Sequence, residues 1–373
     1  MKKLFLGMGV CTIAPFALAK PVVVTSVTPV SMIVAAITGD KADIEQIVSN
    51  TASPHDYALR PSDLRKISQA DAVVWVGESL ENFLEKPLIN ANKAEDSIEW
   101  LALEGTVQRR YGEEDEHHDE HGHDDHDHDE HHDDHDHDEH HDDHDHDEHH
   151  DEHDHDEHHD EHDHDEHDHD EHDHDEHDHD EHHDDHDHDE HHDEHGHEGH
   201  DHTGVDPHVW LSPVNAKVLA QAVAQRLVKI DSANAEYYET NLSSFLQKLD
   251  QQDSQLAAKL SKVKHVPYIV FHDAYRYFEE HYGLNHAGEV TVSPERKPGA
   301  KKIAELRHEI EENNVQCVFS EPQFSPAIVK TLLSGSDVKT AQLDPLGSSV
   351  DIAPQAYLEF LEGLGDQFLS CLG

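Results

Sequence analysis

The chain of 373 residues carries a formal net charge of −58, because 84 aspartates and glutamates stand against only 26 lysines and arginines, with 45 histidines besides. Most of this charge lies in one tract, Glu113 to His202, which contains 49 of the acidic residues and 38 of the histidines but no lysine or arginine. The remainder of the chain is long enough for two modest hydrophobic cores. The strongly acidic balance of the chain argues against binding to a nucleic-acid backbone, because such binding requires a cationic face.

The amino terminus has the order of a secretory signal. Two lysines follow Met1, an apolar run extends from Leu4 to Leu18, and small residues precede a cleavage point after Ala19. The apolar run is too short to span a bilayer. We therefore predict a signal peptide of residues 1–19 and a mature chain that is exported without membrane insertion. A lipid anchor on Cys11 fits less well, because a valine stands where such processing requires a small residue.

Two cysteines, Cys317 and Cys371, remain once the signal peptide is removed. An even pair in an oxidising compartment indicates a disulfide. In the chain-entropy model such a bond would stabilise the fold by roughly 4 kcal/mol. The other interpretation is a pair of buried free thiols.

Alternating strands and helices are predicted on both sides of the tract. Runs of apolar and β-branched residues predict strands at 22–27, 44–49, 72–76, 268–271, 287–292, 317–320 and 339–343. Helical spacing and capping residues predict helices at 31–37, 60–70, 213–227, 234–262, 274–281, 298–313, 326–333 and from 354 onward. A short extended piece is expected at 206–211. Strands separated by helices are typical of α/β folds with parallel sheets.

The predicted helix at 234–262 is longer than an ordinary globular helix and lies between two halves that each resemble a set of βα units. We interpret it as a rigid linking helix. The predicted fold class is therefore α/β, with two lobes. The N-terminal lobe comprises residues 20–112 and 203–233, and the C-terminal lobe comprises residues 263–373.

The tract is built from short repeats. The nine-residue unit DDHDHDEHH occurs three times in tandem from Asp124, and the five-residue unit DEHDH occurs four times in tandem from Asp160. The tract has almost no apolar side chain to bury, so it cannot offset the roughly 1–2 kcal/mol per residue that is lost when a backbone is ordered. We predict a disordered loop at 113–202, inserted in the N-terminal half, whose imidazoles and carboxylates bind metal ions.

Seven histidines lie outside the tract, and they fall into two groups. Four lie in predicted helices or polar connections and are interpreted as surface residues: His265, His281, His286 and His308. The other three, His55, His208 and His272, lie at strand ends or in turns, where ligands bind in open α/β sheets. Three neutral imidazoles suit tetrahedral Zn²⁺, and the tract independently indicates a metal. The alternative is three hydrogen-bonded loop histidines.

Six sequence blocks occur in order outside the tract: SPHDYALRPSDL, ADAVVWVG, VWLSP, FHDAYRYF, SEPQF and LDPLG. Together they resemble the zinc-specific metal-binding receptors of bacterial ABC importers, from the mature start to the C-terminus. The resemblance implies two α/β lobes joined by a long helix, with the metal in the cleft between them. It also implies a periplasmic protein, not an enzyme, that binds Zn²⁺ as a transported ligand and delivers it to the membrane permease of the importer. We expect a monomer.

The resemblance also assigns metal ligands. The family's three histidine ligands correspond to His55 in the HDY block, His208 at the VWLSP block and His272 in the FHDAY block. Some relatives place a glutamate before the first histidine, but here that position is Pro54. The fourth ligand is then either Asp344 in the LDPLG block or a water. Asp344 could equally cap its own turn.

The same resemblance pairs Cys317 with Cys371 as the family's C-lobe disulfide. For the histidines of the tract, His117 to His202, we predict auxiliary zinc capture of low affinity, because exposed flexible ligands lose ordering entropy on binding. The alternative is a repeat-expanded loop with no required role. For the whole protein, the alternatives are an exported zinc store or metallochaperone without an importer, and a zinc hydrolase. The hydrolase would need a general base beside the metal, and Asp344 is its only nearby candidate.

Overall fold

The computed structural model describes residues 19–111, 204–291 and 298–373. The predicted signal peptide and the tract from Glu113 to His202 lie outside these residues, apart from the end of the signal at Ala19. All described residues belong to one compact unit. Within the described ranges, no helix combines the length and apolar character needed to cross a membrane.

The first half of the chain forms a four-stranded parallel sheet in the order β2-β1-β3-β4. Its strands are β1 (Val22–Thr25), β2 (Asp43–Gln46), β3 (Ala72–Trp75) and β4 (Ser97–Glu99). Its helices are α1 (Thr28–Thr38), α2 (Pro61–Gln69) and α3 (Glu78–Asn90). The central strands β1 and β3 are rich in valine, because strands of a parallel sheet are buried on both faces by helices. The order reverses between β1 and β3, so loops that follow their carboxyl ends border a crevice.

The second half repeats this arrangement, in the order β6-β5-β7-β8 with all pairings parallel. Its strands are β5 (Tyr268–His272), β6 (His286–Thr291), β7 (Cys317–Ser320) and β8 (Lys339–Gln342). Its helices are α6 (Arg276–Tyr282), α7 (Ala300–Glu312) and α8 (Ala327–Leu332). Here the switch point lies between β5 and β7. The prediction of two α/β lobes with parallel sheets is confirmed.

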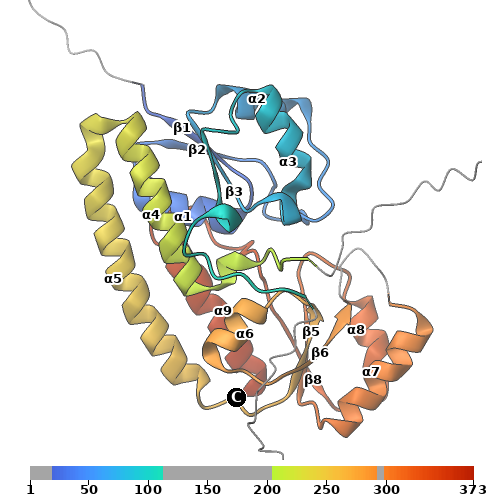
Figure 1. Cartoon of the computed structure of the whole chain (residues 1–373). Helices are drawn as coiled ribbons and strands as arrows, with labels where there is room; N and C mark the ends of the chain where they lie inside the picture. Colours follow the sequence, from blue (N-terminus) through green and yellow to red (C-terminus); the bar gives the residue numbers. More distant parts are fainter. Residues whose placement is uncertain (1–18, 112–203, 292–297) are drawn as a thin grey trace, which may run out of the picture. The chain divides into compact units, whose positions relative to one another are not determined.

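Three longer helices accompany the two sheets: α4 (Pro213–Ile230), α5 (Ala235–Leu260) and α9 (Ala356–Leu372). Helix α4 begins as predicted, because Ser212 accepts a hydrogen bond from the Asn215 amide and Pro213 fills the first turn. With 26 residues, α5 is about 39 Å long and runs along both lobes (Figure 1). It packs against α1, α4 and α9.

The larger hydrophobic core is continuous between the two halves. It includes Val24 of β1, Leu256 of α5, Tyr268 of β5 and Phe368 of α9, all at most 2% exposed. A second, smaller core lies under α7 and α8 and includes Ile269 and Leu306. Because packed cores resist deformation, the shared core ties the two sheets together more firmly than a flexible linker would.

The cysteine pair joins β7 to the last turn of α9. Cys317 and Cys371 form a disulfide across a sequence separation of 54 residues, and both side chains are buried. The predicted pairing is therefore present in the fold.

Two local predictions differ from the structure. Residues 206–211 were expected to be extended, but Val209–Leu211 forms a short 3-10 helix, because Ser212 closes a turn back to Val209 before α4 starts. Helix α3 and strand β4 were not predicted. Pro87 lies inside α3 and β4 has only three residues, so neither offers a long periodic pattern.

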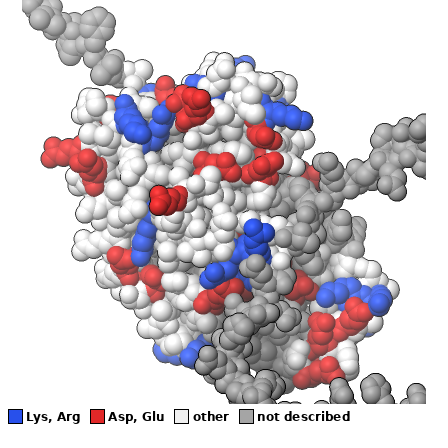
Figure 2. Space-filling view, viewed as in Figure 1, with Lys and Arg blue, Asp and Glu red and all other residues white. Residues whose placement is uncertain are grey.

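Charge is evenly mixed over the described surface that Figure 2 presents. Lys and Arg side chains lie interspersed with Asp and Glu side chains there. On this face the described residues show no concentration of one charge sign, and most of the acidic residues lie in the tract.

Candidate metal centre

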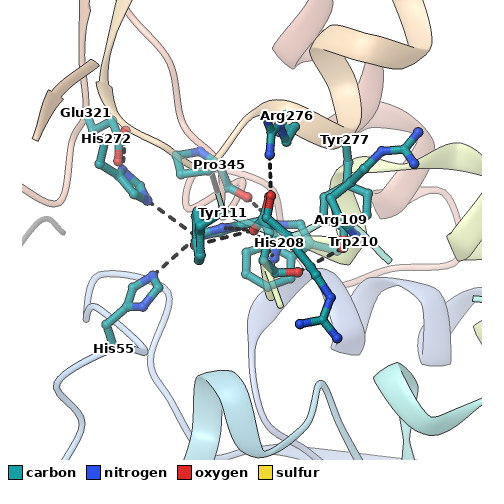
Figure 3. Close-up of polar contacts among 12 residues, drawn as sticks. His55, Arg109, Tyr111, His208, Trp210, His272, Arg276, Tyr277, Glu321 and Pro345 are labelled. Carbon is teal, nitrogen blue, oxygen red and sulfur yellow. Dashed lines mark hydrogen bonds and ion pairs between the residues drawn. The ribbon is translucent and has the colours of Figure 1, made fainter. Parts of the chain in front are cut away.

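The three histidines predicted as ligands converge in space. The Nε2 atom of His208 lies 3.3 Å from Nε2 of His55 and 3.4 Å from Nε2 of His272. Figure 3 shows His55 approaching from one side and His272 from the other, with His208 between them. Among the described residues, this is the one group of three or more His, Cys, Asp or Glu side chains whose donor atoms all lie within 4.8 Å of one another.

The spacing of these nitrogens fits a tetrahedral ion. Two imidazole nitrogens that each lie about 2.05 Å from a tetrahedral zinc are separated by about 3.3 Å. Both distances from His208 Nε2 agree with that value, and the donor atoms of all three histidines lie within 4.8 Å of one another. The ring planes are tilted relative to each other, at 47° for His55 and His208 and 63° for His208 and His272.

Each histidine comes from a different part of the fold. His272 is the last residue of β5 and lies at the switch point of the second sheet. His55 belongs to the turn-rich segment that follows β2. Tyr57 anchors this segment, since its hydroxyl lies 3.1 Å from the Ile47 carbonyl oxygen and 3.0 Å from Asp63 Oδ2.

His208 lies just before the short 3-10 helix that precedes α4, and it is nearly fully buried. The Trp210 indole donates a hydrogen bond to the Pro345 carbonyl at 2.7 Å. The Tyr357 hydroxyl donates to the Trp210 carbonyl at 2.8 Å. These contacts fix the loop that carries His208 against the turn after β8.

Two buried carboxylates orient two of the histidines. Asp206 Oδ1 lies 2.7 Å from His208 Nδ1, and Glu321 Oε1 lies 2.7 Å from His272 Nδ1. An Nδ1–H that donates to a carboxylate leaves Nε2 with a bare lone pair, which is the tautomer a metal requires. Where both rings are neutral and donate from Nδ1, their Nε2 atoms, 3.4 Å apart, can both present a lone pair to a cation.

The charge around the centre is negative and partly titratable. Burial raises the pKa of the Asp206 carboxyl to about 7, although the His208 amide, His272 and Arg276 oppose this shift. Burial also raises the pKa of the neighbouring Asp273 to about 6, reinforced by the negative charges of Asp206 and Glu279. A divalent cation bound to the histidines would favour the ionised forms of these acids.

The histidines line a small cavity. Its volume is about 20 Å³, and its wall also includes Trp210, Glu321 and Gln323. A cavity of this size holds about one water-sized occupant. The cavity therefore suits a single small ion.

The segment before His208 is fixed to the chain that enters the tract. Arg110 and Val205 form an antiparallel bridge, and the Asp206 amide donates to the Arg109 carbonyl at 2.8 Å. The Tyr277 hydroxyl of α6 donates to the Asp206 carbonyl at 2.8 Å. The segments on either side of the tract therefore pair with each other at Arg110 and Val205, and Val205 is three residues before the predicted ligand His208.

Asp344, the predicted carboxylate ligand, is not part of the histidine group. Its Oδ1 accepts hydrogen bonds from Gln323 Nε2 at 2.9 Å and from the Leu346 amide at 3.2 Å. Its Oδ2 accepts from both the amide and the hydroxyl of Ser348 at 2.6 Å. These contacts match the other interpretation of Asp344, in which its carboxylate caps the DPLG turn. Gly347 completes this turn with φ at +61°, where an added Cβ would lie 2.6 Å from Phe360.

Three of the other histidines have local carboxylate partners. His281 pairs with Asp253, His286 with Glu279 and His308 with Glu312. His286 is only partly exposed, and its pKa is raised to about 9 by the surrounding carboxylates Glu279, Asp273 and Glu289, which outweigh its burial. His308 is on the surface as predicted, with 70% of its side chain exposed.

Sequence reasoning did not identify three residues of the site: Asp206, Glu321 and Gln323. Asp206 precedes His208 by two residues, and a D-x-H spacing allows the carboxylate to reach Nδ1 of the same loop. Glu321 and Gln323 lie in the SEPQF block, directly after β7 and next to the end of β5. The sequence signal that could have identified Glu321 and Gln323 is their place directly after a predicted strand, where ligands bind in open α/β sheets.

Comparisons with known proteins agree with this architecture. The family model described as "ZnuA: Zinc-uptake complex component A periplasmic" matches residues 23–371. A relative from Yersinia pestis, named high-affinity zinc uptake system protein ZnuA, is 33% identical over 374 residues, which cover 100% of this chain and 98% of the relative. A relative of the same name from Haemophilus influenzae is 39% identical over 352 residues, covering 94% of this chain and 92% of the relative.

Solved structures show the same fold. "Crystal structure of ZnuA" aligns with a TM-score of 0.64 at 20% identity and covers 95% of this chain and 100% of that chain. A ZnuA deletion mutant lacking residues 138-173, with zinc bound, aligns with a TM-score of 0.63 at 20% identity, covering 95% and 99%. The resemblance predicted from the six motif blocks is confirmed. With a family model matched over nearly its whole length, the chain belongs to the ZnuA family of zinc-uptake components.

Proposed function

We propose that this protein is the periplasmic zinc-binding receptor of an ABC importer and that His55, His208 and His272 hold the transported Zn²⁺. The observation that carries this proposal is the convergence of three Nε2 atoms at 3.3 and 3.4 Å, the separation expected on a tetrahedral zinc. Family membership supports the transport role. The ion is cargo, so the site must bind it tightly and also release it.

The donor set supports zinc over manganese. Three imidazole nitrogens form the group, and Pro54 occupies the position where some relatives have a glutamate. Manganese sites favour oxygen donors, whereas imidazole suits zinc. Asp206 and Glu321 supply negative charge through His208 and His272, which raises the basicity of the ligands without adding oxygen donors to the metal.

The fold supports a modest movement between lobes. We propose an N-terminal lobe of residues 20–112 and 203–233, a linking helix at 234–262 and a C-terminal lobe of residues 263–373. His55 follows a strand of the first sheet and His272 ends a strand of the second, so an ion bound to both holds the lobes together. The long helix α5 and the continuous core limit how far they separate.

Metal binding to protein without the tract tests the location of the site. Deleting residues 113–202 removes the competing histidines, and the remaining protein should bind one Zn²⁺ tightly in a chelator competition. His55→Ala should abolish this tight binding. The matched control is His308→Ala, which removes an exposed histidine of α7 and should leave the affinity unchanged. Tight binding that survives in His55→Ala would contradict the proposed site.

Growth under zinc limitation tests the delivery to an importer. A deletion strain should grow poorly in the presence of a chelator, and the wild-type gene should restore growth, whereas His55→Ala should not. An exported zinc store without an importer partner would instead matter mainly at fluctuating or high zinc. Normal growth of the deletion strain under chelation, with a defect only at high zinc, would favour that alternative.

A further inference from the structure

Gln323 lines the metal cavity and has a buried side-chain oxygen without a partner among the described residues. The residue follows β7 in the EPQF segment and forms part of the wall that the three histidines line. Its Nε2 donates a hydrogen bond to Asp344 Oδ1 at 2.9 Å. Its Oε1 is buried and accepts no hydrogen bond from the described part of the chain.

The orientation of this amide is fixed by Asp344. The Asp344 side chain accepts four hydrogen bonds, from Gln323, the Leu346 amide and the amide and hydroxyl of Ser348. A carboxylate surrounded by donors acts only as an acceptor. Rotating the Gln323 amide by half a turn would place Oε1 against the Asp344 oxygens, where two acceptors repel. Asp344 therefore holds Nε2 toward itself and directs Oε1 away.

A buried carbonyl oxygen without a donor is destabilising by about 1–3 kcal/mol. Such an atom in a ligand cavity indicates that the ligand supplies the donor. A Zn²⁺ ion has no hydrogen to donate, but a water bound to it has two. The three histidines leave one position of a tetrahedral ion open, and Gln323 lines the same cavity as the three histidines.

We propose that Gln323 Oε1 accepts a hydrogen bond from a water that fills the fourth position of the bound zinc. Gln323 is thus a positioning residue, and Asp344 acts through it instead of binding the metal. The inference rests on the proposed zinc-binding function and specifies how the coordination is completed. Since Oε1 can accept but not donate, it favours water over anions such as chloride, which carry no proton.

The test compares zinc affinity among variants of the protein that lacks residues 113–202. Gln323→Met keeps the length of the side chain but removes the acceptor, and we expect zinc affinity to fall by about 10-fold or more while one ion still binds. Gln323→Ala provides a second variant if the first packs poorly. The matched control is Ser348→Ala, which removes another donor to Asp344 but does not alter the cavity wall. It should change affinity less than about 3-fold, within the context dependence of a single polar contact.

Cobalt substitution gives a second measurement that a merely structural role would not change. The visible spectrum of Co²⁺ in the parent protein should be insensitive to added chloride, whereas in Gln323→Met chloride should replace the water and shift the spectrum. Asp344→Asn removes the carboxylate that holds Gln323 Nε2, so its spectrum should become sensitive to chloride in the same way as that of Gln323→Met. Far-UV circular dichroism checks that each variant is folded.

The outcomes separate this inference from the function on which it rests. If the parent binds zinc tightly and His55→Ala does not, but Gln323→Met binds as tightly as Ser348→Ala, only the role of Gln323 is overturned. A cobalt spectrum that changes in Asp344→Asn without added chloride, but stays unchanged in Gln323→Met with or without chloride, would overturn it in favour of direct ligation by Asp344. Tight binding in His55→Ala would instead overturn the proposed function itself.

Discussion

Glu81 is a fully buried carboxyl group that makes stability depend on pH. Its Oε2 accepts hydrogen bonds from the amides of Val76 and Gly77, each at 3.0 Å. Burial raises the pKa of this carboxyl to about 7, with a smaller contribution from Glu99, while the hydroxyl of Ser26 and the two amides act in the opposite direction. Glu81 therefore joins the carboxyl end of β3 to the start of α3 mainly as a neutral acid below that pH.

The sign and size of the effect follow from proton linkage. In the unfolded chain the pKa is close to 4.5, so between about pH 4.5 and pH 7 the folded protein binds more protons than the unfolded one. The free energy of unfolding then falls as pH rises through this window. A pKa difference between about 7 and 4.5 corresponds to about 3 kcal/mol, a contribution that is present below the unfolded pKa and lost above the folded one.

Glu81→Gln tests this reasoning, because an amide resembles the neutral acid and does not titrate. We expect the variant to match the wild type near pH 4.5 and to be more stable by about 3 kcal/mol at pH 8. The assay is urea unfolding of metal-free protein, followed by circular dichroism at both pH values. Glu85→Gln, an exposed acid on the same helix, is the control and should show no such trend. A stability difference between Glu81→Gln and wild type that is the same at both pH values would refute the argument.

Three further predictions concern the disulfide, the histidine partners and the tract. Replacing both Cys317 and Cys371 by Ala should lower the free energy of unfolding by about 4 kcal/mol; urea unfolding with and without reductant checks this, and a reductant should destabilise only the wild type. Asp206→Asn should weaken zinc binding by about 10–100-fold because the amide cannot stabilise the charge on zinc-bound His208; an unchanged chelator competition would contradict this role. Zinc bound by the tract should be lost between about pH 8 and pH 5.5, before zinc in the three-histidine site, since protons compete for exposed imidazoles; equal stoichiometry in equilibrium dialysis at both pH values would argue against it.

The sequence motifs predicted the positions of the three histidines better than the role of Asp344. His55, His208 and His272 stand at strand ends and turns in the sequence, and the structure brings them together as expected. Asp344 also follows a strand, but its carboxylate accepts four hydrogen bonds from its own turn and from Gln323. Which way a side chain points at the end of a strand depends on the turn that follows it, and this is not readable from the motif alone.

The amino-acid sequence by itself predicted the α/β class, a long helix between the two halves, the cysteine pair and the three histidines that converge in the structure. These features depend on local periodicity, on residue count or on ordered motifs, all of which are visible along the chain. Only the tertiary structure decided that Asp206 and Glu321 orient the histidines and that Gln323 lines the cavity. Those contacts depend on how β5 and β7 lie side by side and on where the turn after β8 places Asp344. They are set by packing between distant segments, which no local pattern records.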